Sequence, residues 1–279
     1  MPHPADLYCV MGHPVAHSRS PAIHTRFAEL TQQALVYERR LVPVDHFAQA
    51  VRDFAAAGGR GCNVTVPFKT EAPLQATQRS ERVQLAGAAN TLCFRADGSL
   101  YADNTDGLGL VADITRNAGL SLKGCDVLLI GAGGAAAGVL GPLICAGVRH
   151  ITIANRTVAK AQALVQSHGP LASLQKVELK AIENKALEAD FDVIVNATAS
   201  SLAGAEVPVS GHVLRRESLA YDMMYGPAAQ GFLDWARQHG ATPRDGLGML
   251  VEQAAEAFLL WRGMRPPSAQ VLREMQQAA

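Results

Sequence analysis

A short apolar run that leads directly into a cluster of glycines constrains this chain more than any other feature. Residues 127–148, VLLIGAGGAAAGVLGPLICAGV, carry no charged side chain, and a helix that spans a membrane needs about 20 apolar residues. Six glycines and Pro142 interrupt the run, however, and its first four residues are typical of a strand. We therefore predict a buried strand over 126–130, a tight turn and a helix over 134–146, and no membrane span.

Strand and helix patterns alternate along the rest of the chain. The other expected strands cover residues 7–12, 35–42, 61–66, 88–94, 100–104, 149–154, 191–197 and 218–222. The other expected helices cover residues 20–32, 45–59, 105–118, 157–168, 228–239, 247–263 and 267–277. Such alternation predicts an α/β fold with mostly parallel sheets that helices cover on both faces. The length of 279 residues is enough for two domains at roughly 100–200 residues each.

Two stretches of the first half carry more detailed expectations. Ser20 is expected to cap the helix that begins there, with a proline at the first helical position. In the stretch GCNVTVPFK, the side-chain alternation of a strand puts Asn63 and Thr65 on one face and sends Val64 and Val66 into the core. Ligands bind at the carboxyl ends of strands in open α/β sheets. The polar residues at this strand end are therefore candidates for ligand binding.

Composition excludes several classes of protein. Lysine plus arginine equals aspartate plus glutamate, at 25 each, whereas a nucleic-acid-binding surface needs a basic excess or stripe. The five cysteines include no C-x-x-C pair, which favours reduced thiols in the cytoplasm over a disulfide framework or a metal site. The N-terminus lacks a charged segment followed by an apolar one, so we expect no signal peptide.

The glycine cluster has the pattern of a nucleotide-binding turn. Gly131 to Ala136 fit G-x-G-x-x-A between a predicted strand and a predicted helix, where backbone N–H groups can bind a pyrophosphate. The next strand ends in Asn155-Arg156-Thr157, followed by Lys160, without the acid that would bind the ribose of NAD. A guanidinium suits a 2′-phosphate, so the predicted cofactor is NADP. The alternatives are close helix–strand packing for the glycines and an ordinary surface role for the arginine.

Lys69 and Asp106 are the candidate catalytic residues. Hydride transfer to a ketone creates an alkoxide, which Lys69 could protonate while a carboxylate holds the ammonium group in place. The stretch DNTDG supplies that carboxylate at Asp106. The alternatives are a solvated lysine and an aspartate that caps the next helix. A metal site is not predicted at Asp103 with Asp106, because no third carboxylate or histidine stands nearby. Nor is one predicted at His13, His17 and His24, because prolines interrupt that region.

Nine motifs spread over nearly the whole chain carry a family resemblance. They are GHPVAHSRSP, NVTVPFK, AGAANTL, DNTDG, GAGGA, NRT, NAT, YDMMY and DGLGMLVEQAA. In this order they resemble the shikimate dehydrogenase family, whose NADP-dependent members interconvert 3-dehydroshikimate and shikimate in aromatic amino-acid biosynthesis. The resemblance implies a discontinuous substrate-binding domain, residues 1–104 plus 243–279, and a Rossmann-type NADP-binding domain, residues 105–242.

The resemblance also implies a set of site residues. The catalytic pair is Lys69 and Asp106. The positions that match substrate-binding residues are Ser18, Ser20, Asn63, Thr65, Lys69, Asn90, Asp106, Tyr225 and Gln253. The positions that match cofactor-binding residues are Gly131, Gly133, Gly134, Ala135, Asn155, Arg156, Thr157, Lys160, Thr198, Met223, Gly246 and Met249. The partners implied are a small-molecule substrate and NADP, with no nucleic acid and no membrane.

The chain departs from the family pattern at a few positions. Ala136 and Ala137 stand where Ser-Arg or Ser-Lys is frequent, and Ser201 stands where glycine is common. Two other functions remain open: a quinate/shikimate dehydrogenase that also uses NAD, and a non-catalytic NADP-sensing regulator. The sequence leaves open whether the protein is a monomer or a homodimer.

Overall fold

The computed structural model describes residues 5–198 and 206–277, so Ser201 lies outside the described residues. The chain packs into two compact units, Met1–Gly109 with Leu250–Ala279, and Leu110–Met249. Both boundaries lie a few residues after those expected from the resemblance.

In its described part, the first unit holds one six-stranded sheet with the order β2-β1-β3-β5-β6-β4. The strands are β1 (Asp6–Gly12), β2 (Leu35–Leu41), β3 (Gly59–Val64), β4 (Gln78–Arg79), β5 (Thr91–Phe94) and β6 (Leu100–Asp103). The strand β5 runs antiparallel to both neighbours, and the other pairs are parallel. The strands β5 and β6 thus form a hairpin, and β3 and β6 point the same way.

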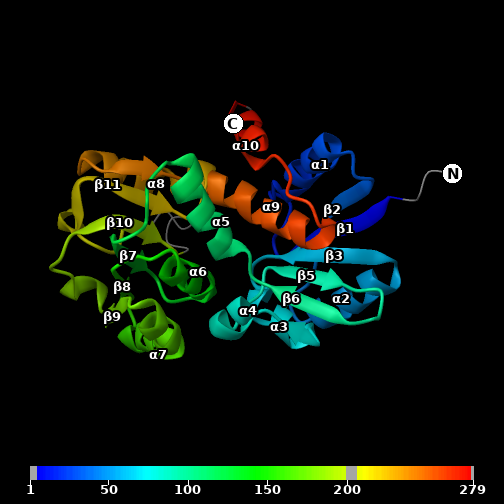
Figure 1. The fold of residues 1–279 in the computed structure, drawn as a ribbon, viewed down its shortest axis with the longest axis horizontal. Helices are drawn as coiled ribbons and strands as arrows, with labels where there is room; N and C mark the ends of the chain where they lie inside the picture. Colours follow the sequence, from blue (N-terminus) through cyan, green and yellow to red (C-terminus); the bar gives the residue numbers. More distant parts are fainter. Residues whose placement is uncertain (1–4, 199–205, 278–279) are drawn as a thin grey trace. The chain divides into compact units, whose positions relative to one another are not determined.

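Helices cover both faces of this sheet (Figure 1). They are α1 (Ser20–Thr31), α2 (Phe47–Ala56), α3 (Ala72–Gln75), α4 (Glu81–Ala86), α9 (Leu247–Arg262) and α10 (Ser268–Gln277). Alternate residues of β1 point to opposite faces of the sheet. Cys9 and Met11 pack with α2, α3 and α4, whereas Tyr8 and Val10 pack on the side of Trp261 in α9. A glycine at position 61 is required there, because an added Cβ would lie 2.5 Å from the Trp261 Nε1 atom.

The strand β3 confirms part of the predicted alternation and corrects the rest. Val64 is 2% exposed in the core, and Asn63 is buried on the opposite face. The strand ends at Val64, however, and Val66 is 65% exposed, so its predicted core position is wrong. Phe68, in the 3₁₀ helix that follows, is fully buried instead and stacks on Phe47 with ring centroids 4.8 Å apart.

The predicted cap of α1 is also wrong. Arg19 is the capping residue of α1, and Ser20 is already its first helical residue. The backbone N–H of Ser20 donates instead to the Ser18 hydroxyl at 3.3 Å. Arg19 makes no side-chain cap, and the Ser18 hydroxyl accepts from one N–H group at the start of α1.

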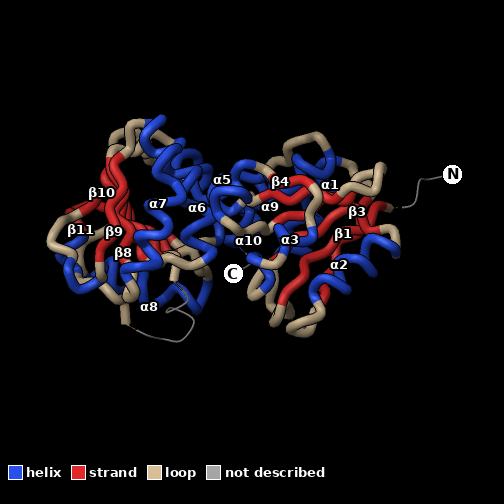
Figure 2. The backbone as a smooth tube through the Cα atoms, turned by 90° about the horizontal axis from the view of Figure 1, so that it is seen from below, coloured by secondary structure: helices blue, strands red, loops and turns tan. Residues whose placement is uncertain are grey.

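The described part of the second unit holds a parallel six-stranded sheet with the order β12-β11-β10-β7-β8-β9. Its strands are β7 (Asp126–Ile130), β8 (His150–Ala154), β9 (Glu178–Ile182), β10 (Phe191–Asn196), β11 (Leu214–Asp222) and β12 (Thr242–Arg244). Its helices are α5 (Asp106–Ala112, beginning in the first unit), α6 (Gly134–Cys145), α7 (Val158–Gln175) and α8 (Gln230–Gln238), and a π-helical turn, Asp113–Asn117, extends α5. Figure 2 shows α6 and α7 together beside this sheet.

This sheet has the strand order of a doubly wound dinucleotide-binding fold. The stretch that imitates a membrane span is β7, a turn and α6, as predicted, and none of the helices in the described residues is long and apolar enough to cross a membrane. The edge strands β9 and β12 were not predicted. The apolar faces of β7 pack into two clusters, one with α6 and α7 and one with α8.

Candidate active site

Lys69 and Asp106 form an ion pair within the first unit. Lys69 follows the carboxyl end of β3, and Asp106 follows the carboxyl end of β6, so the parallel direction of these two strands brings both residues to one edge of the sheet. The Lys69 Nζ atom donates to the Asp106 Oδ2 atom at 2.5 Å. The side chains are 26% and 7% exposed. An ammonium group that is held by a carboxylate and is still accessible can serve as a proton donor.

Asn90 connects this ion pair to α9. Its Nδ2 atom donates to the Asp106 Oδ1 atom at 2.8 Å, to the Gln253 Oε1 atom at 3.1 Å and to the Thr105 Oγ1 atom at 3.0 Å. Its Oδ1 atom accepts from the Thr105 backbone N–H at 2.8 Å. The backbone N–H of Asp106 donates to the Asn104 side chain at 3.1 Å. The Asp106 carboxylate is thus held by Lys69 at one oxygen and by Asn90 at the other.

Asn63 extends the same network toward β2. It pairs in register with Thr91 of β5, and its Nδ2 atom donates to the Thr91 Oγ1 atom at 3.1 Å and to the Asn90 backbone oxygen at 3.2 Å. Thr91 in turn donates to the Asn90 Oδ1 atom at 2.9 Å. Hydrogen bonds thus connect Asn63 with Asp106 through buried side chains of the first unit.

The serine and threonine candidates lie near the start of α1 and the end of β3. Ser18 is half-buried, and its backbone oxygen accepts two bonds from the Arg39 guanidinium at 3.0 and 2.7 Å. Ser20 is 5% exposed. Thr65 is half-buried, and an added Cβ at Gly12 would lie 2.3 Å from its methyl carbon. This close approach explains the glycine at position 12.

The glycine turn of the second unit fits a pyrophosphate. Gly131 has φ +107°, and an added Cβ would lie 3.0 Å from the Thr198 methyl carbon, so the tight turn requires glycine. At Gly133 and Gly134, by contrast, an added Cβ would meet nothing within 4 Å. The protein's own packing therefore does not demand these two glycines, whereas a ligand lying against their backbone would. They begin α6, whose first N–H groups have no partner within the helix.

A polar strand end lies next to this turn, because β8 is the neighbour of β7. Asn155 follows β8, and its Nδ2 atom donates to the Thr157 backbone oxygen at 2.8 Å. Arg156, Thr157 and Lys160 are exposed. Their donors are therefore open to an anionic group, and the hydrogen bond between Asn155 and Thr157 fixes the loop that carries them.

The remaining cofactor candidates, and the substrate candidate Tyr225, differ in accessibility. Thr198 donates to the Asn196 Oδ1 atom at 2.7 Å and is half-buried, as are Met223 and Tyr225. An added Cβ at Gly246 would lie 2.3 Å from the Met223 backbone oxygen, so the chain approaches itself closely there. Met249 is only 6% exposed and packs in the core of the second unit.

Comparison with known proteins then decides the family. The chain matches the shikimate dehydrogenase substrate-binding domain over residues 10–92, shikimate/quinate 5-dehydrogenase over 113–211 and the shikimate 5′-dehydrogenase C-terminal domain over 246–276. The chain belongs to the shikimate dehydrogenase family. Shikimate dehydrogenase (NADP(+)) from Verminephrobacter eiseniae is 77% identical over 275 residues, which cover 99% of this chain and 96% of that protein.

Solved structures with a similar fold are consistent with this family. The Ael1 enzyme from Pseudomonas putida is 44% identical with a TM-score of 0.88, and the match covers 97% of this chain and 98% of that one. Shikimate 5-dehydrogenase from Thermus thermophilus, in complex with NADP(H) and shikimate, is 32% identical with a TM-score of 0.84, and the match covers 98% and 100%.

The structure adds residues that the family motifs did not single out. Thr91 and Thr105 join Asn63, Asn90 and Gln253 in one hydrogen-bonded set. The available signal was their position, since each threonine directly follows or precedes a predicted site residue in AGAANTL or DNTDG. Their hydroxyls can both donate and accept, so Thr91 connects the side chains of Asn63 and Asn90, and Thr105 contacts both Asn90 and Gln253.

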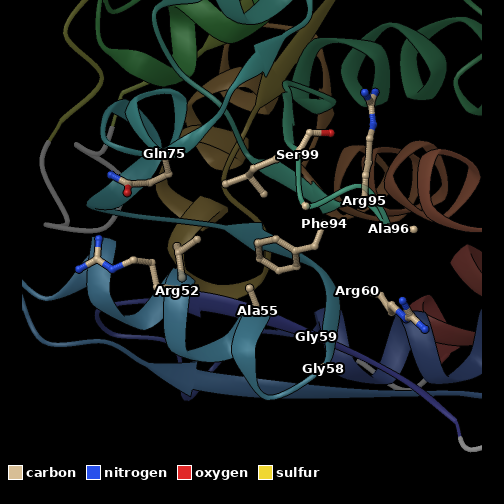
Figure 3. A pocket seen from close by; sticks show the side chains of 13 residues that line it. Arg52, Ala55, Gly58, Gly59, Arg60, Gln75, Phe94, Arg95, Ala96 and Ser99 are labelled. Carbon is tan, nitrogen blue, oxygen red and sulfur yellow. The ribbon is translucent and has the colours of Figure 1, made fainter.

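A separate pocket of about 500 Å³ opens on the first unit (Figure 3). It lies between α2 and the hairpin of β5 and β6, and no residue predicted for the shikimate dehydrogenase site lines it. Phe94 contributes apolar surface, and Arg52, Arg60 and Arg95 extend from its rim in different directions. The lining includes no carboxylate or histidine, so this pocket offers no acid–base pair.

Proposed function

We propose that this protein catalyses the reversible, NADP-dependent reduction of 3-dehydroshikimate to shikimate. The observation that carries the proposal is the ion pair of Lys69 and Asp106, 2.5 Å apart and held by Asn90. The names of the relatives support the reaction, and the NADP(H) and shikimate bound to the Thermus thermophilus enzyme support the ligands. The reaction is an oxidoreduction at a CH–OH group.

Lys69 is the proposed proton donor. When 3-dehydroshikimate binds, the ammonium group lies beside the ring carbonyl oxygen, stabilises its growing negative charge and transfers a proton to it. Asp106 holds the Lys69 ammonium through their hydrogen bond and thereby fixes the direction of proton transfer. In the reverse direction, Lys69 accepts the proton from the substrate hydroxyl.

Each proposed substrate-binding residue has a polar side chain. Tyr225 belongs to the second unit, and the others belong to the first. The full set is Ser18, Ser20, Asn63, Thr65, Lys69, Asn90, Asp106, Gln253 and Tyr225. Serine hydroxyls can donate to the substrate carboxylate, and amide and carboxylate groups suit its hydroxyls.

NADP fits the second unit on two observations. Open space faces Gly133 and Gly134 at the start of α6, and Arg156 is exposed at the end of β8 without an acid beside it in Asn155-Arg156-Thr157. The cofactor supplies or accepts the hydride when it is bound. We propose that the glycine turn with Ala135 binds the pyrophosphate, and that Arg156 and its neighbours, including Lys160, bind the 2′-phosphate. Thr198, Met223, Gly246 and Met249 are assigned to the nicotinamide half.

Steady-state assay with shikimate and NADP tests the proposal. We expect reduction of NADP at the nicotinamide absorbance band, and absence of turnover refutes it and favours the non-catalytic sensor. Parallel assays with quinate and with NAD test the alternative of a quinate/shikimate dehydrogenase that also uses NAD. The matched family description, shikimate/quinate 5-dehydrogenase, includes quinate as a substrate. Because the segment after β8, Asn155-Arg156-Thr157, contains no acidic residue, we expect kcat/KM to be higher with NADP than with NAD.

We further propose that the enzyme works in the cytoplasm as a monomer or homodimer on this small-molecule substrate, without nucleic-acid or membrane partners. Equal numbers of acidic and basic residues support the absence of a nucleic-acid partner. Light scattering on the purified protein measures the oligomeric state.

A further inference from the structure

Tyr37 of β2 contacts the proposed substrate-binding residue Asn63. Its hydroxyl donates to the Asn63 Oδ1 atom at 2.7 Å, and the two residues are 7% and 5% exposed. Burial raises the pKa of the Tyr37 hydroxyl well above its usual range, an effect that the facing Ser20 hydroxyl opposes in part. Tyr37 therefore stays a neutral donor, and it contacts two of the proposed substrate-binding residues.

The surroundings of Asn63 leave only one orientation for its amide. Its Nδ2 atom lies 3.2 Å from the Asn90 backbone oxygen, and a carbonyl oxygen can only accept a hydrogen bond. The Oδ1 atom must then face Tyr37. The Nδ2 atom also donates to the Thr91 hydroxyl at 3.1 Å, so both of its hydrogens are used. Asn63 thus has no donor left, and its remaining capacity lies on the oxygen, which also interacts with the His24 imidazole and opposes in part the lowering of the His24 pKa.

His24 of α1 holds the Tyr37 ring in this position. The two rings stack with centroids 4.3 Å apart and an interplanar angle of 4°. His24 is fully buried beside Phe27 and Phe258, and burial lowers its pKa to about 3. The imidazole is thus neutral at working pH, so it offers Tyr37 a flat uncharged surface and adds no charge near the substrate.

We propose that Tyr37, together with the Asn90 backbone oxygen, is a positioning residue that keeps Asn63 a hydrogen-bond acceptor and so selects a substrate hydroxyl, rather than the carboxylate, at that place. A hydroxyl can donate to the Asn63 oxygen, whereas an ionised carboxylate has no hydrogen to donate. The inference rests on the proposed function, because it takes Asn63 to contact the substrate. Tyr37 acts through Asn63 and has no role in the proton transfer.

The test is Tyr37→Phe, which removes one oxygen atom and keeps the ring. The loss of one neutral hydrogen bond corresponds to about a 3- to 10-fold change. We expect KM for shikimate to rise by about that factor, with kcat and KM for NADP within about twofold of wild type. Tyr8→Phe is the matched control: its ring packs on Trp261 at 4.7 Å, but its hydroxyl lies 3.4 Å from an Arg262 nitrogen instead of bonding Asn63.

A double-mutant cycle separates positioning from general loosening of the fold. In an Asn63→Ala background, Tyr37→Phe should change KM for shikimate by less than about twofold, because Tyr37 has nothing left to orient. With methyl shikimate, which lacks the carboxylate charge, Tyr37→Phe should raise KM by the same factor as with shikimate. If Tyr37→Phe raises KM for shikimate but leaves KM for methyl shikimate unchanged, the carboxylate binds at Asn63 and the inference is overturned.

The outcomes separate the inference from the proposed function. If wild type turns over shikimate with NADP but Tyr37→Phe leaves KM unchanged, or lowers kcat as much as it raises KM, the inference is wrong and the proposed function stands. If wild type does not turn over shikimate at all, both are wrong.

Discussion

Replacement of Lys69 by methionine tests the proposed proton donor most directly. The change removes the ammonium group and keeps most of the side-chain stem. A positioned acid contributes about 10²–10⁴-fold to rate, so kcat should fall by that factor, which equals about 2.7–5.4 kcal/mol of activation free energy. KM for shikimate should stay within about threefold, because the remaining contacts of the substrate-binding residues are intact.

The structure also sets the expected effect on stability. Asp106 is 7% exposed and loses its cation, but it keeps the hydrogen bond from the Asn90 amide at 2.8 Å. Leaving a buried group partly unsatisfied costs about 1–3 kcal/mol of unfolding free energy. Thermal denaturation of Lys69→Met should therefore show a lower Tm, with a cooperative transition. That measurement separates loss of catalysis from loss of fold.

The assay follows the reduced-nicotinamide absorbance under initial-rate conditions with both substrates varied. Lys123→Met is the matched control, since the same change is made at an exposed position of the second unit, outside the proposed site residues. The control should keep wild-type kcat and KM. A kcat for Lys69→Met within about tenfold of wild type, from protein that is folded by the Tm measurement, refutes Lys69 as proton donor.

Three further substitutions test other parts of the molecule. Arg156→Gln should raise KM for NADP by about 10- to 150-fold, the worth of a hydrogen bond to a charged group, and leave KM for NAD within about twofold. Arg244→Met should lower the free energy of unfolding by about 3–5 kcal/mol in urea denaturation, because Asp113 is fully buried and loses a two-bond ion pair of 2.6 and 2.7 Å; Arg149→Met, whose side chain is 66% exposed, should cost under about 1 kcal/mol. His24→Phe should flatten the acid dependence of stability. Since the folded-state pKa of His24 is lowered from 6.5 to about 3, the unfolded chain binds a proton that the folded chain does not, and wild type should lose about 1.4 kcal/mol per pH unit as pH falls through that window. Equal slopes for wild type and His24→Phe would contradict this.

The sequence correctly predicted those strands, turns and helices whose form depends on neighbouring residues alone. The apolar run before Gly131 predicted β7 and α6 with boundaries within a residue, because a buried strand, a turn at positive φ and a helix start each have a residue signature. Alternation likewise predicted opposite faces for Asn63 and Val64. The edge strands β9 and β12 were missed, since half-exposed strands with mixed polarity lack a clear period.

The errors occurred where the chain leaves regular structure. Val66 fits the alternation of β3, but the backbone turns away from the sheet after Val64, and the larger Phe68 fills the core against Phe47. Ser20 has the right residue type for a cap, but α1 has no side-chain cap, and the N–H of Ser20 itself donates to the Ser18 hydroxyl. In both cases a neighbour two residues away competes for the same position, and only the three-dimensional path of the chain decides between them.

The polar network of the first unit shows why motif residues need not share one role. Asn90 uses both hydrogens of its amide on Asp106, Gln253 and Thr105, and its oxygen accepts from Thr91 and Thr105. Such a side chain orients its neighbours, and a substrate hydroxyl that binds Asn90 must replace one of these hydrogen bonds. Spare donors remain on the Lys69 ammonium, and spare lone pairs remain on the carboxylate of Asp106. Donors and acceptors side by side suit hydroxyl groups, each of which needs both, so the hydrogen-bonding capacity that the fold leaves unused itself favours a polyhydroxylated substrate.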